Sequence, residues 1–245
     1  METNQTPIIQ VRKLRKVYMM GQEHVVALHN INLDIPRGEV CCIFGTSGSG
    51  KSTLLNQLAG LEKPTRGVVR IGGVPVSLLN ENQLAAFRQK HIGFVFQSYN
   101  LLPELTAAEN VAMPLMFKGV PPETRLLEAR KMLCRVGLKD RMDHFPNQMS
   151  GGQQQRVGIA RAFITRPEVV FADEPTGNLD SKTTKEVMHM IRGFAHRFHQ
   201  TIVLVSHDPE MTEYADRIVT LIDGSIVSDV KNQVRAEIDA APYIE

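Results

Sequence analysis

The octapeptide from Gly45 to Ser52 constrains the fold of this chain more than any other stretch, because it matches G-x-x-x-x-G-K-[ST] at every fixed position. The apolar run from Val40 to Phe44 precedes it, and the segment from Ser52 to Ala59 contains no Gly or Pro. This order predicts a strand, a loop and a helix. The loop residues are Gly45, Thr46, Ser47, Gly48, Ser49, Gly50, Lys51 and Ser52.

This loop is expected to bind phosphate groups. Its glycines allow successive backbone N–H groups to turn inward, and the N-terminus of the following helix adds partial positive charge. We expect Lys51 to reach the β- and γ-phosphates of a nucleotide, and the hydroxyl of Ser52 to bind Mg²⁺. The alternative is a glycine-rich turn that fits the pattern by chance. The loop alone does not define the reaction.

Composition excludes several classes of protein. The chain has 245 residues, 42% of them hydrophobic, which is enough for a buried core. Its 28 basic and 26 acidic residues give a net charge of +2, so no nucleic-acid partner is indicated. The sequence predicts no membrane span and no signal peptide. Cys41, Cys42 and Cys134 lack metal-ligand spacing, and we expect them in the core of a reduced, cytosolic chain.

The order of elements predicts an α/β fold. Short apolar runs between Ile8 and Ile35 indicate early strands, with Tyr18 in a polar gap between them. Further strands are expected at 68–71, 92–96, 169–172 and 201–205, with a hairpin of 217–222 and 225–230 around Asp223-Gly224. Helices are expected at 81–89, after a capping box formed by Thr106 and Glu109, from Pro121 to about Val136, and at 181–198. Strands this apolar predict a parallel sheet covered on both faces, to which early antiparallel strands and a helical insertion are added.

Two carboxylates follow the apolar run from Val169 to Ala172. Asp173 and Glu174 would lie at the carboxyl edge of a parallel sheet, where ligands bind. Asp173 is suited to hold Mg²⁺, and Glu174 to accept a proton from an attacking water. Alone, such a pair could equally be a helix cap or a solvated loop.

A second glycine-bearing helix start follows Met149. Ser150, Gly151, Gly152 and Gln153 precede a helix that we expect to run through Ile164 and to present bare N–H groups to an anion. A chain with one nucleotide seldom needs two such sites, unless the second serves another copy of that nucleotide. A flexible Gly-Gly helix start is the alternative.

Together these motifs resemble those of ABC transporter ATPase subunits, over roughly Ile8 to Val230. The motifs are Gly45 to Ser52, Gln97, Met149 to Gln153, Val169 to Glu174, Asn178-Leu179-Asp180 and His207. The resemblance implies a P-loop NTPase (RecA-like) parallel-sheet core with an N-terminal antiparallel β subdomain. It implies one ABC ATPase domain over 1–245, with core and β subdomain at 1–97 and 166–230, a helical subdomain at 98–165 and a tail at 231–245.

The resemblance also implies a role for individual residues. Tyr18 matches the aromatic that stacks on adenine, and Thr53 belongs with the loop to the ATP-binding set. Gln97 matches the glutamine that touches Mg²⁺ and the lytic water, and His207 the histidine that contacts the γ-phosphate. Asp180 matches the acid at a dimer seam. Catalysis is expected from Glu174, His207, Gln97 and Lys51, and Mg²⁺ binding from Ser52, Gln97 and Asp173.

The implied machine is a head-to-tail dimer of two copies, in which Ser150 to Gln153 of one closes over ATP held by Lys51 of the other. Its expected partners are integral permease subunits, and its place is the cytoplasmic face of the inner membrane. Met149 and Asn178 are mild departures from the family pattern.

The stretches 93–103 and 173–181 are similar to those of the ATPases of lipoprotein-releasing, macrolide-exporting, antimicrobial-peptide-resistance and cell-division permease systems. Three alternatives stay open: a small-molecule kinase, a soluble ABC protein of translation or DNA repair, and a signalling complex that moves no substrate. No cargo can be read from these residues.

Overall fold

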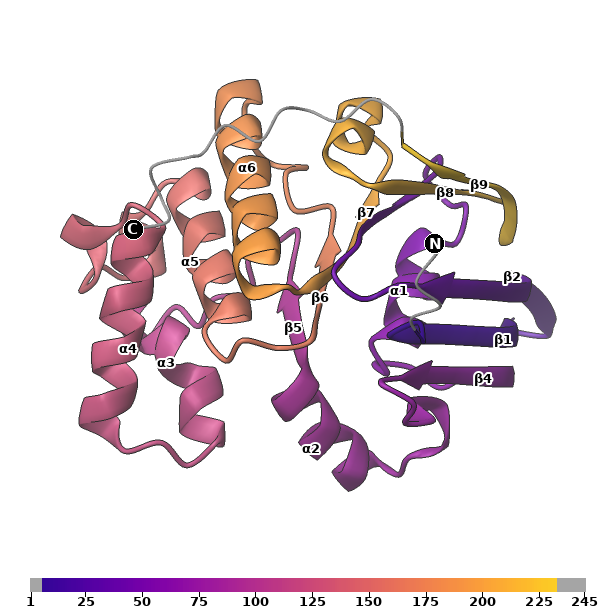
Figure 1. Ribbon diagram of the computed structural model, residues 1–245, viewed down its shortest axis with the longest axis horizontal. Helices are drawn as coiled ribbons and strands as arrows, with labels where there is room; N and C mark the ends of the chain where they lie inside the picture. Colours follow the sequence, from indigo (N-terminus) through magenta and orange to yellow (C-terminus); the bar gives the residue numbers. More distant parts are fainter. Residues whose placement is uncertain (1–5, 233–245) are drawn as a thin grey trace. The chain divides into compact units, whose positions relative to one another are not determined.

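The computed structural model describes residues 6–232. It contains two compact units (Figure 1). The first comprises the chain up to Arg88 together with the segment that begins at Thr201. The second runs from Gln89 to Gln200. The boundary at Arg88 falls inside a helix, α2 (Glu81–His91).

The first unit contains a three-stranded antiparallel sheet of β1 (Ile9–Met20), β2 (Glu23–Ile35) and β4 (Arg66–Ile71), in the order β2-β1-β4 (Figure 1). Residues of β1 alternate in burial at its start, with Ile9, Val11 and Leu14 buried. Tyr18 lies inside β1, opposite Val25 of β2, so the expected polar gap at this position is wrong. The strand continues through this position because half-buried Tyr18, like Lys16 and Val17 before it, pairs with β2 up to the turn at Gly21.

The first unit also contains the strands that carry the phosphate loop. β3 (Val40–Phe44) pairs in parallel with β7 (Thr201–Ser206) and with β8 (Arg217–Ile222), and β8 pairs with β9 (Ser225–Lys231) in an antiparallel hairpin. All six residues of β7 are buried. Helix α1 (Lys51–Leu58) follows β3, and the 3₁₀ helices η1 (Val76–Leu78) and η4 (Pro209–Tyr214) complete the unit.

The second unit pairs β5 (Ile92–Val95) in parallel with β6 (Val169–Asp173) and is otherwise helical. Its helices are α3 (Ala107–Phe117), α4 (Pro122–Arg135), α5 (Gly151–Phe163) and α6 (Ser181–Phe198), with 3₁₀ turns η2 (Lys139–Arg141) and η3 (Pro146–Gln148). Phe163 and Phe194 bring α5 and α6 together, with ring centroids 5.2 Å apart.

The local chemistry of this unit follows the sequence. Thr106 and Glu109 form the expected capping box at the start of α3, and Pro122 is the first residue of α4. Cys41 and Cys42 are buried as expected, whereas Cys134 is exposed, which contradicts its assignment to the core. Cys134 lies on the amphipathic α4, whose other side packs inward through Ala129, Met132 and Leu133.

Two further expectations concern the ends of the chain and the membrane. Of the predicted tail at 231–245, residues 233–245 lie outside the part of the chain that the structure describes. Within 6–232, no helix has the length and apolar character that a membrane span requires. The predicted division into core and helical subdomain stays a prediction.

Candidate nucleotide site

The phosphate loop has a backbone that only glycine allows at two positions. Gly48 and Gly50 have φ of 79° and 98°, in the left-handed region. A Cβ on Gly45 would lie 2.2 Å from the carbonyl oxygen of Leu221, so β8 approaches this residue too closely for any side chain. The loop therefore takes its shape from both its own residues and the strand beside it.

The loop is also held from outside. The N–H of Gly224, in the turn between β8 and β9, donates to the carbonyl oxygen of Ser49 at 2.9 Å, and the Gly224 carbonyl accepts from His29 of β2 at 2.7 Å. A Cβ on Gly50 would lie 2.6 Å from the carbonyl oxygen of Ala27. Strand β2 and the β8–β9 turn thus fix the position of the loop.

Lys51 is buried, and its Nζ donates to the carbonyl oxygen of Thr46 at 2.7 Å, so the side chain folds back across the loop. The N–H groups of Lys51, Ser52 and Thr53, in the first turn of α1, have no acceptor within that helix, whose first bond runs from Leu54 N to Gly50 O. The Ser49 hydroxyl is buried inside the loop without a hydrogen-bond partner. A glycine-rich loop that leads through a buried lysine into a helix N-terminus fits a phosphate chain.

Tyr18 is held by charged neighbours. Its hydroxyl donates to Glu62 Oε2 at 2.7 Å, and Lys16 lies 3.1 Å from the same carboxylate and 4.9 Å from the Tyr18 ring centroid. Burial raises the pKa of Tyr18, and the bond to Glu62 raises it further. The hydroxyl is therefore neutral at physiological pH, and its bond to Glu62 orients the ring.

His207 follows β7 directly, and Gly45 follows β3. Because Phe44 of β3 is the parallel partner of Ser206 of β7, His207 and the first loop residue leave the sheet at the same edge. His207 and the phosphate loop therefore lie at the same edge of the sheet in the first unit, and contact of His207 with the γ-phosphate stays a prediction.

The second unit brings another set of expected residues together. Asp173 ends β6, and Gln97 comes two residues after β5; since Val95 pairs with Ala172, both leave the strands at one edge. A Cβ on Gly177 would lie 3.0 Å from Gln97 Nε2 and 3.5 Å from Glu174 Oε2. The Gln97 amide and the Glu174 carboxylate therefore face the same glycine.

Glu174 has a left-handed backbone, with φ of 41°. For a residue other than Gly, Asn or Asp this conformation is uncommon and costs roughly 1–3 kcal/mol. A turn holds it, in which Gly177 N donates to the Glu174 carbonyl oxygen at 3.1 Å. Strain of this kind concentrates at functional sites, so the observation supports a functional role for the side chain.

Ser150 is the N-cap of α5. Its Oγ accepts from Gln153 N at 3.3 Å, and its N–H donates to Gln153 Oε1 at 3.0 Å, forming a capping box. The hydroxyl hydrogen stays available as a donor, and the helix offers no acceptor to the N–H groups of Gly151 and Gly152. This helix start can receive an anion.

Asp180 caps the neighbouring helix α6 and accepts from Lys182 N and Thr183 N at 3.1 and 3.0 Å. The backbone N–H of Thr183 and its hydroxyl lower the pKa of Asp180. Thr183 also lies against the Ser150 segment, because a Cβ on Gly152 would come 2.7 Å from its Cγ2. The starts of α5 and α6 are therefore adjacent.

Sequence reasoning missed the contacts that join these loops. Arg161 of α5 is buried and donates to the carbonyl oxygens of Asn100 at 2.6 Å and Tyr99 at 2.7 Å. Asn178 Nδ2 donates to the Gln97 carbonyl oxygen at 3.1 Å. The sequence does contain one sign of these contacts: Arg161 lies inside the apolar run of α5, and a buried arginine requires hydrogen-bond partners.

The expected Mg²⁺ ligands have suitable chemistry. Ser52, Gln97 and Asp173 offer a hydroxyl, an amide oxygen and a carboxylate, which are the hard oxygen donors that Mg²⁺ prefers. Within residues 6–232, no three His, Cys, Asp or Glu side chains cluster as a metal site. Mg²⁺ is often bound by one carboxylate together with phosphate oxygens of the substrate, so these three residues are suitable ligands for this ion.

Comparisons with known proteins agree with this geometry. A family model described as ABC transporter matches residues 28–177. Macrolide export ATP-binding/permease protein MacB of Vibrio parahaemolyticus is 46% identical over 225 residues, which cover 92% of this chain and 34% of that protein. MacB of Escherichia coli K12 is 46% identical over 222 residues, again 34% of its length. The chain thus spans about a third of these relatives.

Two solved structures are similar along almost their whole length. A dimeric post-hydrolysis state of the ATP-binding cassette MJ0796 bound to ADP and Pi has a TM-score of 0.86 and 42% identity, covering 91% of this chain and 98% of that one. A second dimeric structure of MJ0796, described as a bacterial ABC transporter cassette, has a TM-score of 0.86 and 43% identity. This likeness confirms the expected α/β P-loop NTPase fold.

Proposed function

The chain belongs to the ABC transporter family, and on this premise we propose that it is an ATP-hydrolysing nucleotide-binding subunit. It would dimerise on ATP and drive a membrane permease by conformational change. The observation that carries the proposal is the phosphate loop, with its left-handed Gly48 and Gly50 at the start of α1 and its buried Lys51. The expectation of an ABC ATPase is confirmed at the level of the family.

We propose that residues of the first unit bind ATP. The Tyr18 ring stacks on adenine, the N–H groups from Gly48 to Thr53 bind the phosphates, and Lys51 releases the Thr46 carbonyl to meet the β- and γ-phosphates. His207 contacts the γ-phosphate. Such positioning and charge stabilisation supply most of the catalysis in phosphoryl transfer to water.

The second unit supplies the hydrolytic groups. Glu174 accepts a proton from the attacking water, and Gln97 orients that water. Ser52, Gln97 and Asp173 would hold Mg²⁺, which neutralises charge on the phosphate oxygens when bound. The strained backbone of Glu174 supports this role, because strain persists where a side chain must be aimed.

Dimerisation explains the second anion-binding helix start. We propose that Ser150, Gly151, Gly152 and Gln153 of one copy close over the ATP of the other, with Asp180 at the seam. Both similar solved structures are dimers, and one holds ADP and Pi. Hydrolysis then separates the two copies, and this conformational change drives the permease.

The partner is proposed to be an integral permease, which keeps the chain on the cytoplasmic face of the inner membrane. The support is the likeness to MacB, whose printed name joins an ATP-binding part to a permease. Met116 and Phe117, at the end of α3, are exposed apolar side chains that suit a protein partner. Whether the permease exports macrolide-like substrates or signals to a wall enzyme is decided by that partner.

Two substitutions test the proposal. Lys51→Ala should abolish ATP binding, because the lysine is the main side-chain cation of the loop. Glu174→Gln should bind ATP normally, accumulate as a dimer and hydrolyse ATP about 10²–10⁴-fold more slowly. Equilibrium binding, size-exclusion chromatography with ATP and phosphate release measure these results. Full turnover by Glu174→Gln would remove this residue from the role of base.

An assay without any acceptor molecule separates this reading from a small-molecule kinase. The proposed ATPase releases phosphate when water is its only acceptor, whereas a kinase needs a second substrate. A rate that rises with the square of protein concentration at low concentration would further support two copies acting together.

A further inference from the structure

A basic hollow lies on the three-stranded sheet β2-β1-β4 of the first unit. Its volume is about 630 Å³, within the usual range for small-molecule sites. Four of its lining residues are cationic and none is acidic; the lining comprises Arg12, Lys13, Arg15, Asn30, Asn32, Arg66, Gly67 and Val68. None of these belongs to the nucleotide site described above.

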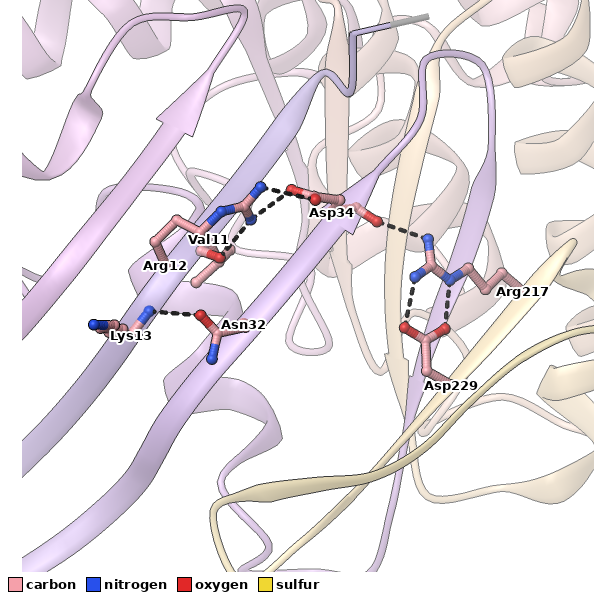
Figure 2. A network of polar contacts seen from close by, with 7 residues as sticks. All are labelled: Val11, Arg12, Lys13, Asn32, Asp34, Arg217 and Asp229. Carbon is pink, nitrogen blue, oxygen red and sulfur yellow. Dashed lines mark hydrogen bonds and ion pairs between the residues drawn. The ribbon is translucent and has the colours of Figure 1, made fainter. Parts of the chain in front are cut away.

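Irregular backbone shapes this basic hollow. Lys13 of β1 and Asn30 of β2 have φ of 49° and 48°, and the register of β1 against β2 shifts between Val11 and Leu14. The Lys13 N–H donates to Asn32 Oδ1 at 3.0 Å, as Figure 2 shows, and Asn32 Nδ2 donates to the Asn30 carbonyl at 3.0 Å. The wall is therefore held by specific hydrogen bonds.

Strand β4 closes in on the same bulge. A Cβ on Gly67 would lie 2.4 Å from the carbonyl oxygen of Lys13, so the two backbones approach as closely as a glycine permits. Arg15 and Arg66 flank this contact.

One of the four cations is already neutralised. Arg12 forms two hydrogen bonds to the Asp34 carboxylate, at 2.7 and 2.8 Å. Arg217 donates to the Asp34 carbonyl oxygen at 2.6 Å and forms a bidentate pair with Asp229 of β9 (Figure 2). Arg12 is thereby oriented by a network that also joins β2 to the β8–β9 hairpin.

The other three cations have no carboxylate partner anywhere in the described part of the chain. They are Lys13, Arg15 and Arg66, all exposed. Arg15 and Arg66 are direct cross-strand partners of the antiparallel β1–β4 pair. Like charges in this position destabilise a sheet, and an anion between them would remove that repulsion.

We propose that this basic hollow binds a ligand that carries two or more phosphate charges. Guanidinium groups match phosphate oxygens through paired N–H donors, and Lys13 adds a point charge. Three uncompensated cations favour a di- or trianion over a singly charged ligand. The phosphates belong to a soluble phosphate compound or to a lipid headgroup, and both sources present the same chemistry.

The test uses pyrophosphate as the soluble probe, with saturating Mg-ADP present so that the phosphate loop is filled. Isothermal titration calorimetry should show pyrophosphate binding that weakens at least ten-fold in the double variant Arg15→Gln/Arg66→Gln. Arg70→Gln is the matched control, because Arg70 is an exposed cation of β4 outside the hollow. Its affinity should stay within two-fold of the unaltered chain.

Cosedimentation with phosphatidylcholine vesicles, with and without phosphatidic acid, tests the lipid source. Binding that requires phosphatidic acid and is lost in the double variant supports the proposal with a lipid ligand. If neither probe binds, or if binding survives in the double variant, the proposal is wrong. ATP hydrolysis should be unchanged in the double variant. The basic hollow can therefore fail to bind a phosphate ligand while the proposed ATPase activity stands, and the two outcomes are distinguishable.

Thermal unfolding supplies an independent readout. Without ligand, Arg15→Gln should raise the Tm by roughly 1–3 °C, because it removes the repulsion from Arg66. With saturating Mg-ADP present, as in the calorimetric test, pyrophosphate should raise the Tm of the unaltered chain and of Arg70→Gln, but not that of the double variant. A Tm that falls in Arg15→Gln would contradict the repulsion on which the site rests.

Discussion

The guanidinium of Arg161 donates a hydrogen bond of 2.6 Å to the carbonyl oxygen of Asn100, three residues after Gln97. A second bond reaches the carbonyl of Tyr99, and both of these acceptor residues have left-handed backbones, with φ of 62° for Tyr99 and 47° for Asn100. Arg161 lies on α5, the helix that begins after Ser150. One side chain therefore holds the Gln97 loop on the helix that carries the second anion site.

Arg161→Met should loosen this loop. It leaves two carbonyl groups without their charged donor, so we expect a loss of about 2–4 kcal/mol in the free energy of unfolding and lower ATP turnover. Hydrogen exchange at residues 97–101 should accelerate.

Arg156→Met is the control for Arg161→Met, because Arg156 lies on the same helix and pairs with Glu186 and the Val136 carbonyl. It should destabilise the chain without changing exchange at 97–101. Equal exchange in both variants would show that Arg161 does not act locally on the loop.

Ser150→Ala and Thr106→Ala separate capping from nucleotide contact. Both residues head capping boxes, so each substitution should cost about 0.5–2 kcal/mol of stability. Only Ser150→Ala should also impair ATP-dependent dimerisation and hydrolysis, because only Ser150 is proposed to meet the nucleotide of the other copy. Denaturant unfolding and phosphate release measure the two effects. An equal loss of turnover in both variants would reduce Ser150 to a structural cap.

Gly45→Ala and Gly158→Ala should have opposite effects on stability. The first places a Cβ 2.2 Å from the Leu221 carbonyl oxygen and must displace the loop, whereas the second meets only Tyr99 O at 3.8 Å. We expect Gly45→Ala to lose ATP binding and stability. Gly158→Ala, inside α5, should gain up to about 1 kcal/mol from helix propensity. Calorimetric melting together with ATP titration checks both, and normal ATP affinity in Gly45→Ala would contradict the tight contact.

The bond between Glu62 and Tyr18 should be sensitive to acid. Burial alone would raise the pKa of Glu62, but hydrogen bonds from Tyr18 and Lys16 outweigh it, so the pKa is lowered. A lowered folded pKa means that this stabilisation is present above the unfolded pKa, about 4.3, and is lost as the pH falls through the folded value. The difference in Tm between the unaltered chain and Glu62→Gln should shrink below about pH 4.3. A difference that does not change with pH would mean that the carboxylate contributes no charge-dependent stability.

Elements with their own local signals could be predicted from the sequence. Thr106 with Glu109 gives a capping box, and Asp223-Gly224 between two apolar runs gives a hairpin, because these residues act through neighbours in the chain. The second half of β1 has a weaker signal, since Lys16, Val17 and Tyr18 are all half-buried and do not alternate in burial as the start of the strand does. The assignment of Cys134 to the core is wrong, because the residue type alone does not indicate which side of a helix faces solvent.

The candidate site was predictable as a set of residues but not as an arrangement. The phosphate loop and the Asp173-Glu174 pair have patterns of their own. The left-handed backbone of Glu174 has no such signal, since glutamate rarely adopts it. The partners of Arg161 lie about sixty positions earlier in the chain and are backbone carbonyls, so no side-chain pattern points to them.

The β8–β9 turn has a practical consequence for anyone who alters this protein. Hairpin tips are the usual choice for epitope tags, fluorophores or circular permutation, because extra residues there rarely disturb a domain. Here Gly224 bonds both Ser49 and His29, so one added residue at Asp223 would withdraw a support from the phosphate loop. Labels belong elsewhere, for example on the exposed thiol of Cys134.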